Sequence, residues 1–347
     1  MTIRIGIGLF TGQVRPGSSR TFTQEYRDTV DLVRLAETVG FDSAWVSEHH
    51  GAGDGYFPSL LPMLAAFAEA TERISLGTGV MLTPFHDPLR LAEDAATVDL
   101  LSGGRLVLGL GLGWREEEFR MFGVPLRERA ARTAETVEIL RRAWTGERFS
   151  FEGSAFAYDR VQVRPAPERP GGASIPIVLG GHAEAAIRRA GATADGWIRS
   201  RAADVAATMH DLSILESAAR DAGRDPAALS FVQIRSAFPW DDGDAWEVVR
   251  DGLAHATDVY AGWAAGGDTP GTGFVLPPQD PGAAPSGAAV GSPEQVAHAL
   301  RPFAEAFGDR RDATLVVRLH FPGMDVRTSS HAVELFGEHV IPALKGA

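Results

Sequence analysis

The chain has 347 residues, of which 44% are hydrophobic and 22% charged, and this composition is typical of a globular protein rather than of a disordered or fibrous one. Its formal net charge of −12 argues against nucleic acid or an anionic membrane surface as a partner, because both attract clustered Lys and Arg. The absence of cysteine excludes disulfides, thiolate nucleophiles, Cys-ligated zinc and iron–sulfur clusters.

The N-terminus has the pattern of a first β-strand and not of a targeting segment. Residues 1–10 lack the basic region, long apolar run and small-residue cleavage site of a signal peptide. No apolar run approaches the roughly 18 residues of a membrane span. We therefore expect a cytoplasmic protein.

Short apolar runs alternate with helical periodicity along the whole chain, which is typical of βα units around a parallel sheet. Helical apolar stripes occur, for example, at Tyr26–Val39 and Arg132–Trp144. Eight units predict a closed α/β barrel, the (β/α)8 or TIM barrel, formed as a single domain over residues 1–347. The predicted strands are Ile3–Leu9, Phe41–Val46, Ile74–Leu82, Arg105–Leu110, Ile175–Leu179, Gly196–Arg199, Leu229–Arg235 and Thr314–Leu319.

Two insertions interrupt this pattern. Residues 149–170 combine alternating aromatic side chains with prolines and predict a surface hairpin. Residues 264–291 are rich in Gly, Pro and Ala and contain few large apolar side chains, so they are expected to be poorly ordered. Two interpretations of this second insertion stay open, a mobile lid over the site and a disordered insertion.

The most informative motif is the triplet Glu48, His49 and His50, which follows the predicted strand Phe41–Val46. Side chains just past the carboxyl ends of parallel strands lie at the mouth of a barrel, where active sites form. Because successive side chains diverge on extended backbone, only one imidazole is expected to face a ligand. We take His49 and Glu48 as candidate catalytic residues, with a structural histidine as the alternative.

Glycines mark two further strand ends. Gly109, Gly111 and Gly113 alternate, which allows close approach of a ligand or of backbone, although the spacing is not that of a dinucleotide-binding motif. A second group opens a predicted helix, where free backbone amides can bind a phosphate, a plain strand-to-helix turn being the alternative. This second group is Gly180, Gly181, His182 and Ala183.

Several side chains near strand ends predict an apolar or aromatic substrate. The candidate substrate-lining residues are Phe10, Phe57, Phe85 and His320. A metal-dependent hydrolase is the less favoured alternative, because such barrels usually place two imidazoles on one strand face in an HxH pair, and His49, His86 and His320 form no such pair.

In combination, the triplet at 48–50 and the segments 73–84, 86–133 and 175–198 resemble the bacterial luciferase-like superfamily of flavin- and F420-dependent oxidoreductases. The resemblance runs over almost the whole chain and implies a TIM barrel with reduced flavin at its mouth. It matches His49 to an essential histidine and implies a cis peptide bond between Gly79 and Val80. The residues it implies at the cofactor, with the second glycine group, are Thr78, Gly79, Val80, Leu112, Gly113, Trp114, Gly180, Gly181, His182 and Ala183.

The chain departs from this family pattern at Leu112, where luciferase carries an arginine for the flavin phosphate. Deazaflavin members often have an apolar residue there, and the segment Val317–Asp325 is also like theirs. However, Glu48 opens the triplet as in luciferase, and Trp114 stands where sugar-phosphate dehydrogenases of that group carry an acidic glutamate.

The prediction is therefore a flavin-dependent monooxygenase, expected to be a homodimer, that uses O2 and reduced FMN from a separate flavin reductase. The alternatives are an F420-dependent oxidoreductase that transfers hydride without O2 and a catalytically silent flavin-binding barrel.

Overall fold

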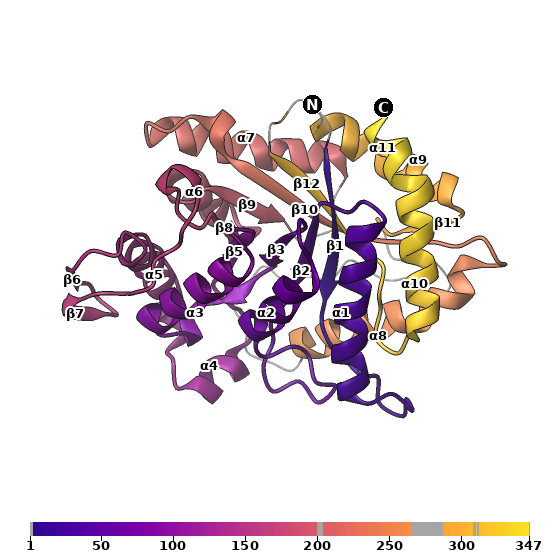
Figure 1. The fold of residues 1–347 in the computed structure, drawn as a ribbon, viewed down its shortest axis with the longest axis horizontal. Helices are drawn as coiled ribbons and strands as arrows, with labels where there is room; N and C mark the ends of the chain where they lie inside the picture. The colour runs from indigo at the N-terminus through magenta and orange to yellow at the C-terminus, as the bar shows by residue number, and fades with distance from the viewer. Residues whose placement is uncertain (1–2, 200–203, 266–286, 308–309, 311, 347) are drawn as a thin grey trace.

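The structure is a computed structural model that describes residues 3–199, 204–265, 287–307, 310 and 312–346. Within these residues, eight parallel strands close into a barrel in the order β10, β12, β1, β2, β3, β5, β8, β9, with β9 pairing back onto β10. They are β1 (Arg4–Phe10), β2 (Ser43–Val46), β3 (Ser75–Thr78), β5 (Leu106–Gly111), β8 (Ile177–Gly180), β9 (Gly196–Arg199), β10 (Ser230–Pro239) and β12 (Ala313–Arg318). The predicted TIM barrel is confirmed (Figure 1).

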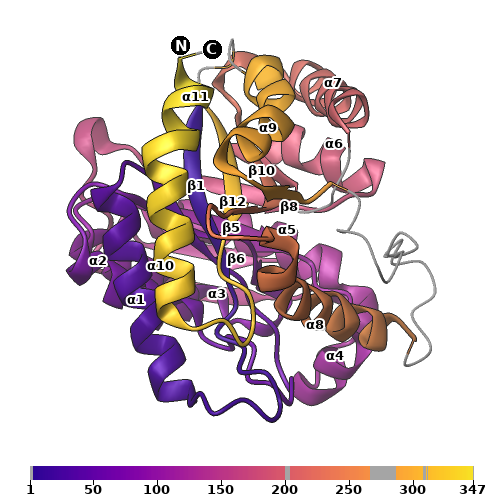
Figure 2. The same cartoon turned by 90° about the vertical axis from the view of Figure 1, so that its right-hand side faces the viewer.

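Helices cover the outside of this barrel (Figures 1 and 2). They are α1 (Phe22–Thr38), α2 (Leu60–Ala70), α3 (Pro88–Leu101), α5 (Arg129–Ala143), α6 (Glu184–Thr193), α7 (Val205–Asp221), α9 (Pro293–Phe307), α10 (Val326–Leu335) and α11 (Ile341–Lys345). The helices α4 (Glu116–Phe122) and α8 (Ala245–Ala265) lie in both views at the end opposite the two chain termini. Because β1 starts near the N-terminus, that end is the mouth formed by the carboxyl ends of the strands.

Local signals in the sequence fix where the helices begin. The Asp87 carboxylate accepts hydrogen bonds of 3.0 Å from the backbone amides of Leu89 and Arg90, and Pro88 opens α3 with its fixed φ. Thr21 and Gln24 form a reciprocal capping box at the start of α1. These caps define the first turn of α1 and of α3.

The interior of the barrel is filled beneath the mouth by the indole of Trp45. Its Nε1 donates to the hydroxyl of Ser43 at 2.9 Å, and its ring packs in a cluster that includes Ile198 and Val316. Strand glycines leave room for this ring: a Cβ at Gly77 would lie 2.3 Å from the indole Cε3. Leu9 and Val80 pack on the same cluster.

The third predicted strand, Ile74–Leu82, is interrupted. It forms β3 and the short β4 (Met81–Leu82), separated by a cis peptide bond between Gly79 and Val80. The cis bond implied by the family resemblance is thus confirmed. A second cis bond, between Gly8 and Leu9, had no counterpart in the sequence analysis.

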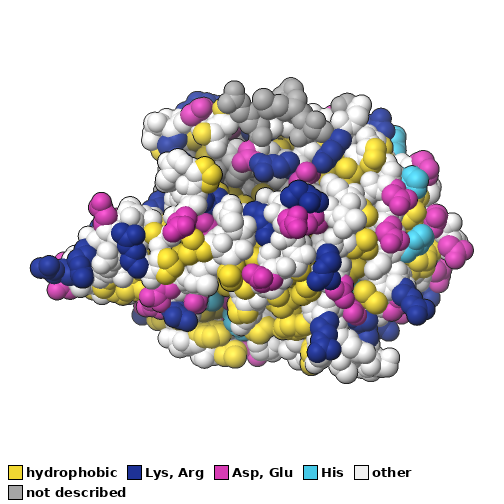
Figure 3. Space-filling model, viewed as in Figure 1, with side chains coloured by type: hydrophobic (Ala, Val, Ile, Leu, Met, Phe, Trp, Pro, Cys, Tyr) yellow, Lys and Arg dark blue, Asp and Glu magenta, His cyan; other side chains and the backbone are white. Residues whose placement is uncertain are grey.

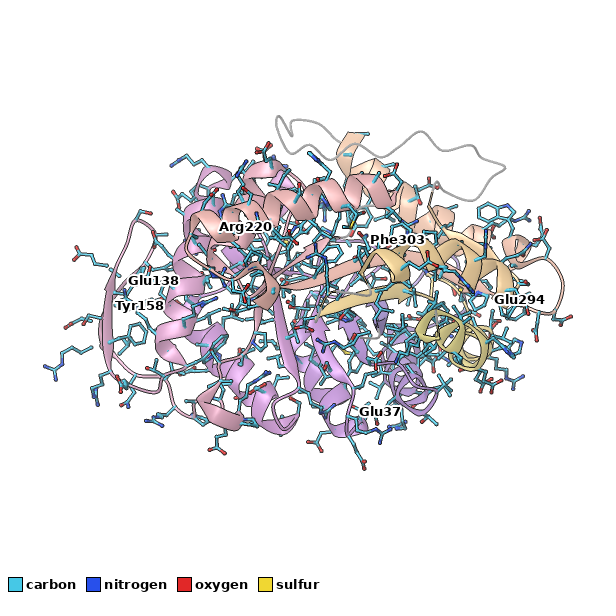
Figure 4. All side chains as sticks on the ribbon, turned by 90° about the horizontal axis from the view of Figure 1, so that it is seen from above. Glu37, Glu138, Tyr158, Arg220, Glu294 and Phe303 are labelled. Atoms are coloured by element: carbon cyan, nitrogen blue, oxygen red, sulfur yellow. The ribbon has the colours of Figure 1, made fainter. Side chains whose placement is uncertain are left out.

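The first insertion forms the predicted hairpin, in which β6 (Phe149–Glu152) pairs antiparallel with β7 (Ala157–Val161). Figure 4 shows Tyr158 on this hairpin near Glu138 of α5, at the opposite end of the molecule from Glu294. In the second insertion, residues 264–265 complete α8 and Ala289–Gly291 form β11 beside β10. The two ends of this insertion are therefore ordered, and the expectation of poor order is wrong for them. The lid interpretation concerns residues 266–286, which lie outside the described part of the chain.

The face drawn in Figure 3 carries acidic and basic side chains interspersed, with apolar side chains between them. Among the described helices, none combines the length and the apolar character that a bilayer crossing requires.

Candidate active site

A cavity of about 480 Å³ opens at the barrel mouth, a size suited to a small molecule. Its wall comes from the ends of six strands and from α5, α6 and α8. It brings together both proposed catalytic residues and most of the residues proposed at the cofactor. Those in the wall are Glu48, His49, Gly79, Val80, Leu112, Gly113, Trp114, Gly180, Gly181, His182 and Ala183.

His49 lies in this wall between two hydrogen-bonding partners that the sequence analysis did not identify. Its Nδ1 is 2.9 Å from Oε1 of Glu118 in α4, and its Nε2 is 3.1 Å from the hydroxyl of Tyr260 in α8. The Glu118 side chain is almost completely buried, so its charge acts in a medium of low dielectric. A histidine oriented by a buried carboxylate is a common arrangement for acid–base chemistry.

The His50 side chain contacts Glu48 of the same triplet and does not line the cavity. Its Nε2 lies 2.6 Å from Oε1 of Glu48, which also contacts His86 Nε2 at 3.1 Å, while Oε2 accepts the Leu82 amide at 2.9 Å. Burial favours a raised pKa for Glu48, but the hydrogen bonds and charges of His50 and His86 outweigh it and hold the pKa at about 2. Only one imidazole of the pair faces the cavity, as the diverging side chains predicted.

Four aromatic rings surround the imidazole of His49. The ring centroids of Tyr56, Trp114, Tyr260 and Trp263 lie 4.8, 6.3, 5.4 and 4.6 Å from that of His49. Two of these rings come from α8, which therefore closes the mouth on that side. The enclosure removes water from the imidazole and strengthens its electrostatic contacts.

Arg115 joins this enclosure to the carboxylate behind it. Its guanidinium carbon lies 4.0 Å from the ring centre of Trp263, and its NH1 is 3.3 Å from Oε1 of Glu118. The same nitrogen donates to the carbonyl of His50 at 2.9 Å. The start of α4, the triplet and α8 are thus held together by one buried cation.

Protein atoms fill the space beside the glycines Gly109, Gly111 and Gly180 at the strand ends. A Cβ at Gly111 would lie 2.4 Å from Cγ2 of Val80, and one at Gly180 would lie 2.9 Å from Cγ1 of the same side chain. A Cβ at Gly109 would lie 1.9 Å from the carbonyl oxygen of Thr78. Val80 therefore sits in a slot between β5 and β8 and forms part of an apolar wall.

Arg129, which the sequence analysis did not identify, supplies a cation at this cavity. It is the first residue of α5, and its NH1 lies 3.4 Å from the Gly113 carbonyl. Within the described chain it has no carboxylate within salt-bridge distance, and burial lowers the pKa of its guanidinium. A helix N-terminus is an unfavourable place for a positive charge, which suits a site where an anion binds.

Five predicted contact residues lie elsewhere. The Thr78 hydroxyl is buried and hydrogen-bonds the Gly109 backbone at 2.7 Å. Phe10 and Phe57 belong to the main hydrophobic core, Phe85 packs on Phe119 and Phe122, and His320 bridges Glu25 and Ser329 at 2.6 and 2.7 Å. None of these side chains is part of the cavity wall, so the expectation that they line it is corrected.

The physical reason is the same in each case: proximity to a strand end does not fix the direction of a side chain. For the unanticipated residues the available signals were weak. Glu118 belongs to an acidic run just after a glycine-rich strand, which is also typical of a solvated helix start. Tyr260 and Trp263 come from a helix far along the chain, and no local pattern connects them with His49. The described residues contain no group of three or more His, Asp and Glu side chains arranged to hold a metal ion.

Residues 3–310 match the family described as luciferase-like monooxygenase. An F420-dependent glucose-6-phosphate dehydrogenase of Amycolatopsis mediterranei is 33% identical over 179 residues, which cover 50% of this chain and 53% of that protein. The chain thus spans about half the length of the first curated relatives it matches.

Two solved structures cover 99% of this chain and 99% of their own. Monooxygenase RslO1 from Streptomyces bottropensis is 26% identical with a TM-score of 0.79. The oxygenating constituent of 3,6-diketocamphane monooxygenase from Pseudomonas putida, in complex with FMN, is 22% identical with a TM-score of 0.76, a likeness that shows the fold alone.

The match over residues 3–310 takes in all the strands from β1 to β11 and every residue described above in the cavity wall. The relatives named with it include an F420-dependent enzyme and an enzyme in complex with FMN. The chain belongs to the luciferase-like monooxygenase family of oxidoreductases.

Proposed function

We propose that the protein is a flavin-dependent monooxygenase that uses reduced FMN and O2 to oxidise a small apolar or aromatic substrate. The observation that carries this proposal is the pairing of His49 with buried Glu118 inside an enclosure of four aromatic rings at the cavity. Monooxygenation needs proton transfer where water is excluded, and this arrangement provides both.

The residues of the cavity fit a flavin. Leu9 and Val80 offer an apolar wall for a planar ring system, and Arg129 offers an unpaired cation for a phosphate. The amides at the start of α6 add a positive helix end on another part of the wall. When bound, the reduced flavin supplies the two electrons that activate O2.

The protein's side chains take the remaining tasks. We assign His49 to proton exchange at the cavity. We assign Glu48 a positioning role, because three donors already occupy its carboxylate and fix His50 and β4. The aromatic rings keep water from the reacting atoms.

An F420-dependent dehydrogenase is the second candidate. The observations that favour it are the apolar Leu112 in the cavity wall and the 33% identical F420-dependent relative. That activity would use the same cavity and the same histidine, but would transfer a hydride without O2.

Equilibrium binding of the two cofactors tests the proposal. We expect reduced FMN to bind the protein more tightly than reduced F420 under anaerobic conditions. Arg129→Gln should weaken FMN at least about tenfold, because a charge-assisted phosphate contact is worth about 1.5 to 3 kcal/mol. Arg127→Gln is the matched control, since the Arg127 side chain is 83% exposed and lies two residues before α5. Tight F420 binding together with weak FMN binding contradicts the monooxygenase.

The same proposal includes two partners, a separate flavin reductase and a second copy of the chain in a homodimer. It also includes a cytoplasmic location. Turnover with NADH should require an added flavin reductase. Light scattering should give twice the chain mass of 37.0 kDa.

A further inference from the structure

A continuous series of hydrogen bonds leads from Glu118 through His49 to two tyrosines. The Nε2 of His49 lies 3.1 Å from the Tyr260 hydroxyl, which lies 3.0 Å from the hydroxyl of Tyr56. Tyr260 lines the cavity, whereas Tyr56 is 3% exposed and is not part of its wall. The ring nitrogen of His49 that is free of the carboxylate therefore faces a phenol.

The direction of these bonds follows from the donors available. Oε1 of Glu118 accepts from the amide of His50 at 2.9 Å and from Arg115 at 3.3 Å, and an ionised carboxylate can only accept. The Nδ1 of His49 must therefore donate, which leaves Nε2 of the neutral ring as an acceptor. Burial raises the pKa of the Tyr260 phenol, so its hydroxyl carries the proton that Nε2 accepts.

We propose that Tyr260, and not His49 directly, exchanges protons with a ligand bound in the cavity, with His49 behind it as the proton reservoir and Glu118 holding the imidazole in place. This inference deepens the proposed function and rests on it. It makes Tyr260 a catalytic residue, His49 the base that serves it and Glu118 a positioning residue.

The transfer balances in both directions. When the ligand needs a proton, the Tyr260 O–H bond breaks toward an oxygen of the ligand, and the Nε2 proton of the His49 imidazolium passes to the phenolic oxygen. The ligand gains one proton, His49 becomes neutral, and solvent restores its proton between turnovers. The reverse movement removes a proton from the ligand, and the charge of Glu118 stabilises the imidazolium that results.

The first test uses the protein without cofactor. Nitrogen-15 labelling of the ten histidines, with His49→Gln to assign the signal, reports the bonding of each ring nitrogen. We expect Nδ1 of His49 to carry the proton and Nε2 to accept a hydrogen bond. In Tyr260→Phe the Nε2 signal should move toward that of an unbonded nitrogen while Nδ1 changes little. An unchanged Nε2 signal in that variant overturns the proposal.

The second test uses reduced FMN and O2 as the probe, with reoxidation of the bound flavin followed by absorbance. Tyr260→Phe and His49→Ala should each slow it by about 10² or more, the usual contribution of an acid or base. Because the two act as one unit, the double variant should lie within about threefold of the slower single variant. Tyr56→Phe, which removes the next hydroxyl in the series, should slow it less than tenfold.

The outcomes separate the two ideas. A wild-type rate in Tyr260→Phe beside a slow His49→Ala means that the imidazole acts directly, and it overturns this inference while the monooxygenase stands. Failure to bind FMN removes the proposed function, but the nitrogen signals of the cofactor-free protein still decide whether Tyr260 donates to His49. Melting temperatures of all variants identify any that have lost the fold.

Discussion

Glu48 and His50 form a hydrogen bond of 2.6 Å within a single triplet, so the second imidazole is bound by the carboxylate that precedes the first. The same carboxylate contacts His86 at the end of the next strand unit. Of the two imidazoles only that of His49 faces the cavity, whereas Glu48, which also lies in the cavity wall, joins neighbouring strand ends through His50 and His86. These contacts also make stability depend on pH in two directions.

Glu48 should contribute to acid lability. Burial opposes its charge, but the two histidines outweigh burial and lower its folded pKa to about 2 from 4.5. A depressed pKa contributes stability that is present above about pH 4.5 and lost as pH falls toward 2, on the order of 3 kcal/mol. Urea unfolding of Glu48→Gln should show a flatter pH dependence in this window than the wild type, and parallel curves would contradict the assignment.

His86 should make the stability of the protein depend on pH above about 6.5. Burial favours a lowered pKa, but the hydrogen bond and charge of Glu48 outweigh it and raise the pKa above 6.5. A raised pKa contributes stability that is present below about pH 6.5 and lost as pH rises through the folded value. His86→Asn should therefore lose more stability at pH 5.5 than at pH 9. Equal losses at both values would indicate a neutral contact only.

Replacing Glu118 by Gln should lower turnover about 10- to 100-fold with little change in FMN affinity, because the imidazolium of His49 loses the opposite charge. Removing one member of a buried charged group typically costs about 3 to 5 kcal/mol, and here the cost should lie at or below the lower end, because Arg115 would keep its ion pair with the exposed Glu117. Glu118→Asp keeps the charge and should recover part of the activity. A normal turnover number in the Gln variant would show that the carboxylate only fills space.

Gly111→Ala should destabilise the protein by about 1 to 3 kcal/mol, because the new methyl group would lie 2.4 Å from Val80. The shortened side chain in Val80→Ala removes that contact, so the double variant should be more stable than Gly111→Ala alone. Thermal unfolding of the four proteins forms a double-mutant cycle. If the losses of stability in the two single variants add up in the double variant, the contact between position 111 and Val80 is not the source of the strain.

Leu112→Arg should tighten FMN binding if FMN is the cofactor. Leu112 lines the cavity, as does Arg129, so a second guanidinium there can reach a bound phosphate. Fluorescence titration should show the increase for FMN and none for riboflavin, which lacks the phosphate. A gain with riboflavin would point to packing on the ring instead.

The strands were predictable because buried parallel strands are short, apolar and bounded by turn residues, and Gly196–Arg199 was placed without error. Residues at the cavity that lie at or just beyond strand ends, such as Gly180 and His49, were predictable for the same reason. Phe10 and Phe57 were misplaced because an apolar side chain suits both the core and a ligand site. Tyr260 was missed because only the folded chain brings α8 to the triplet.

The indole of Trp45 fills the barrel interior beneath the cavity and so limits the depth of the cavity. Leu9 and Val80, which form part of the cavity wall, rest on the cluster that this ring fills. The glycines of the neighbouring strands cannot occupy the space if the ring is shortened, because they have no side chains. A shorter side chain at position 45 should therefore deepen the cavity, at the expense of the packing that keeps the eight strands closed.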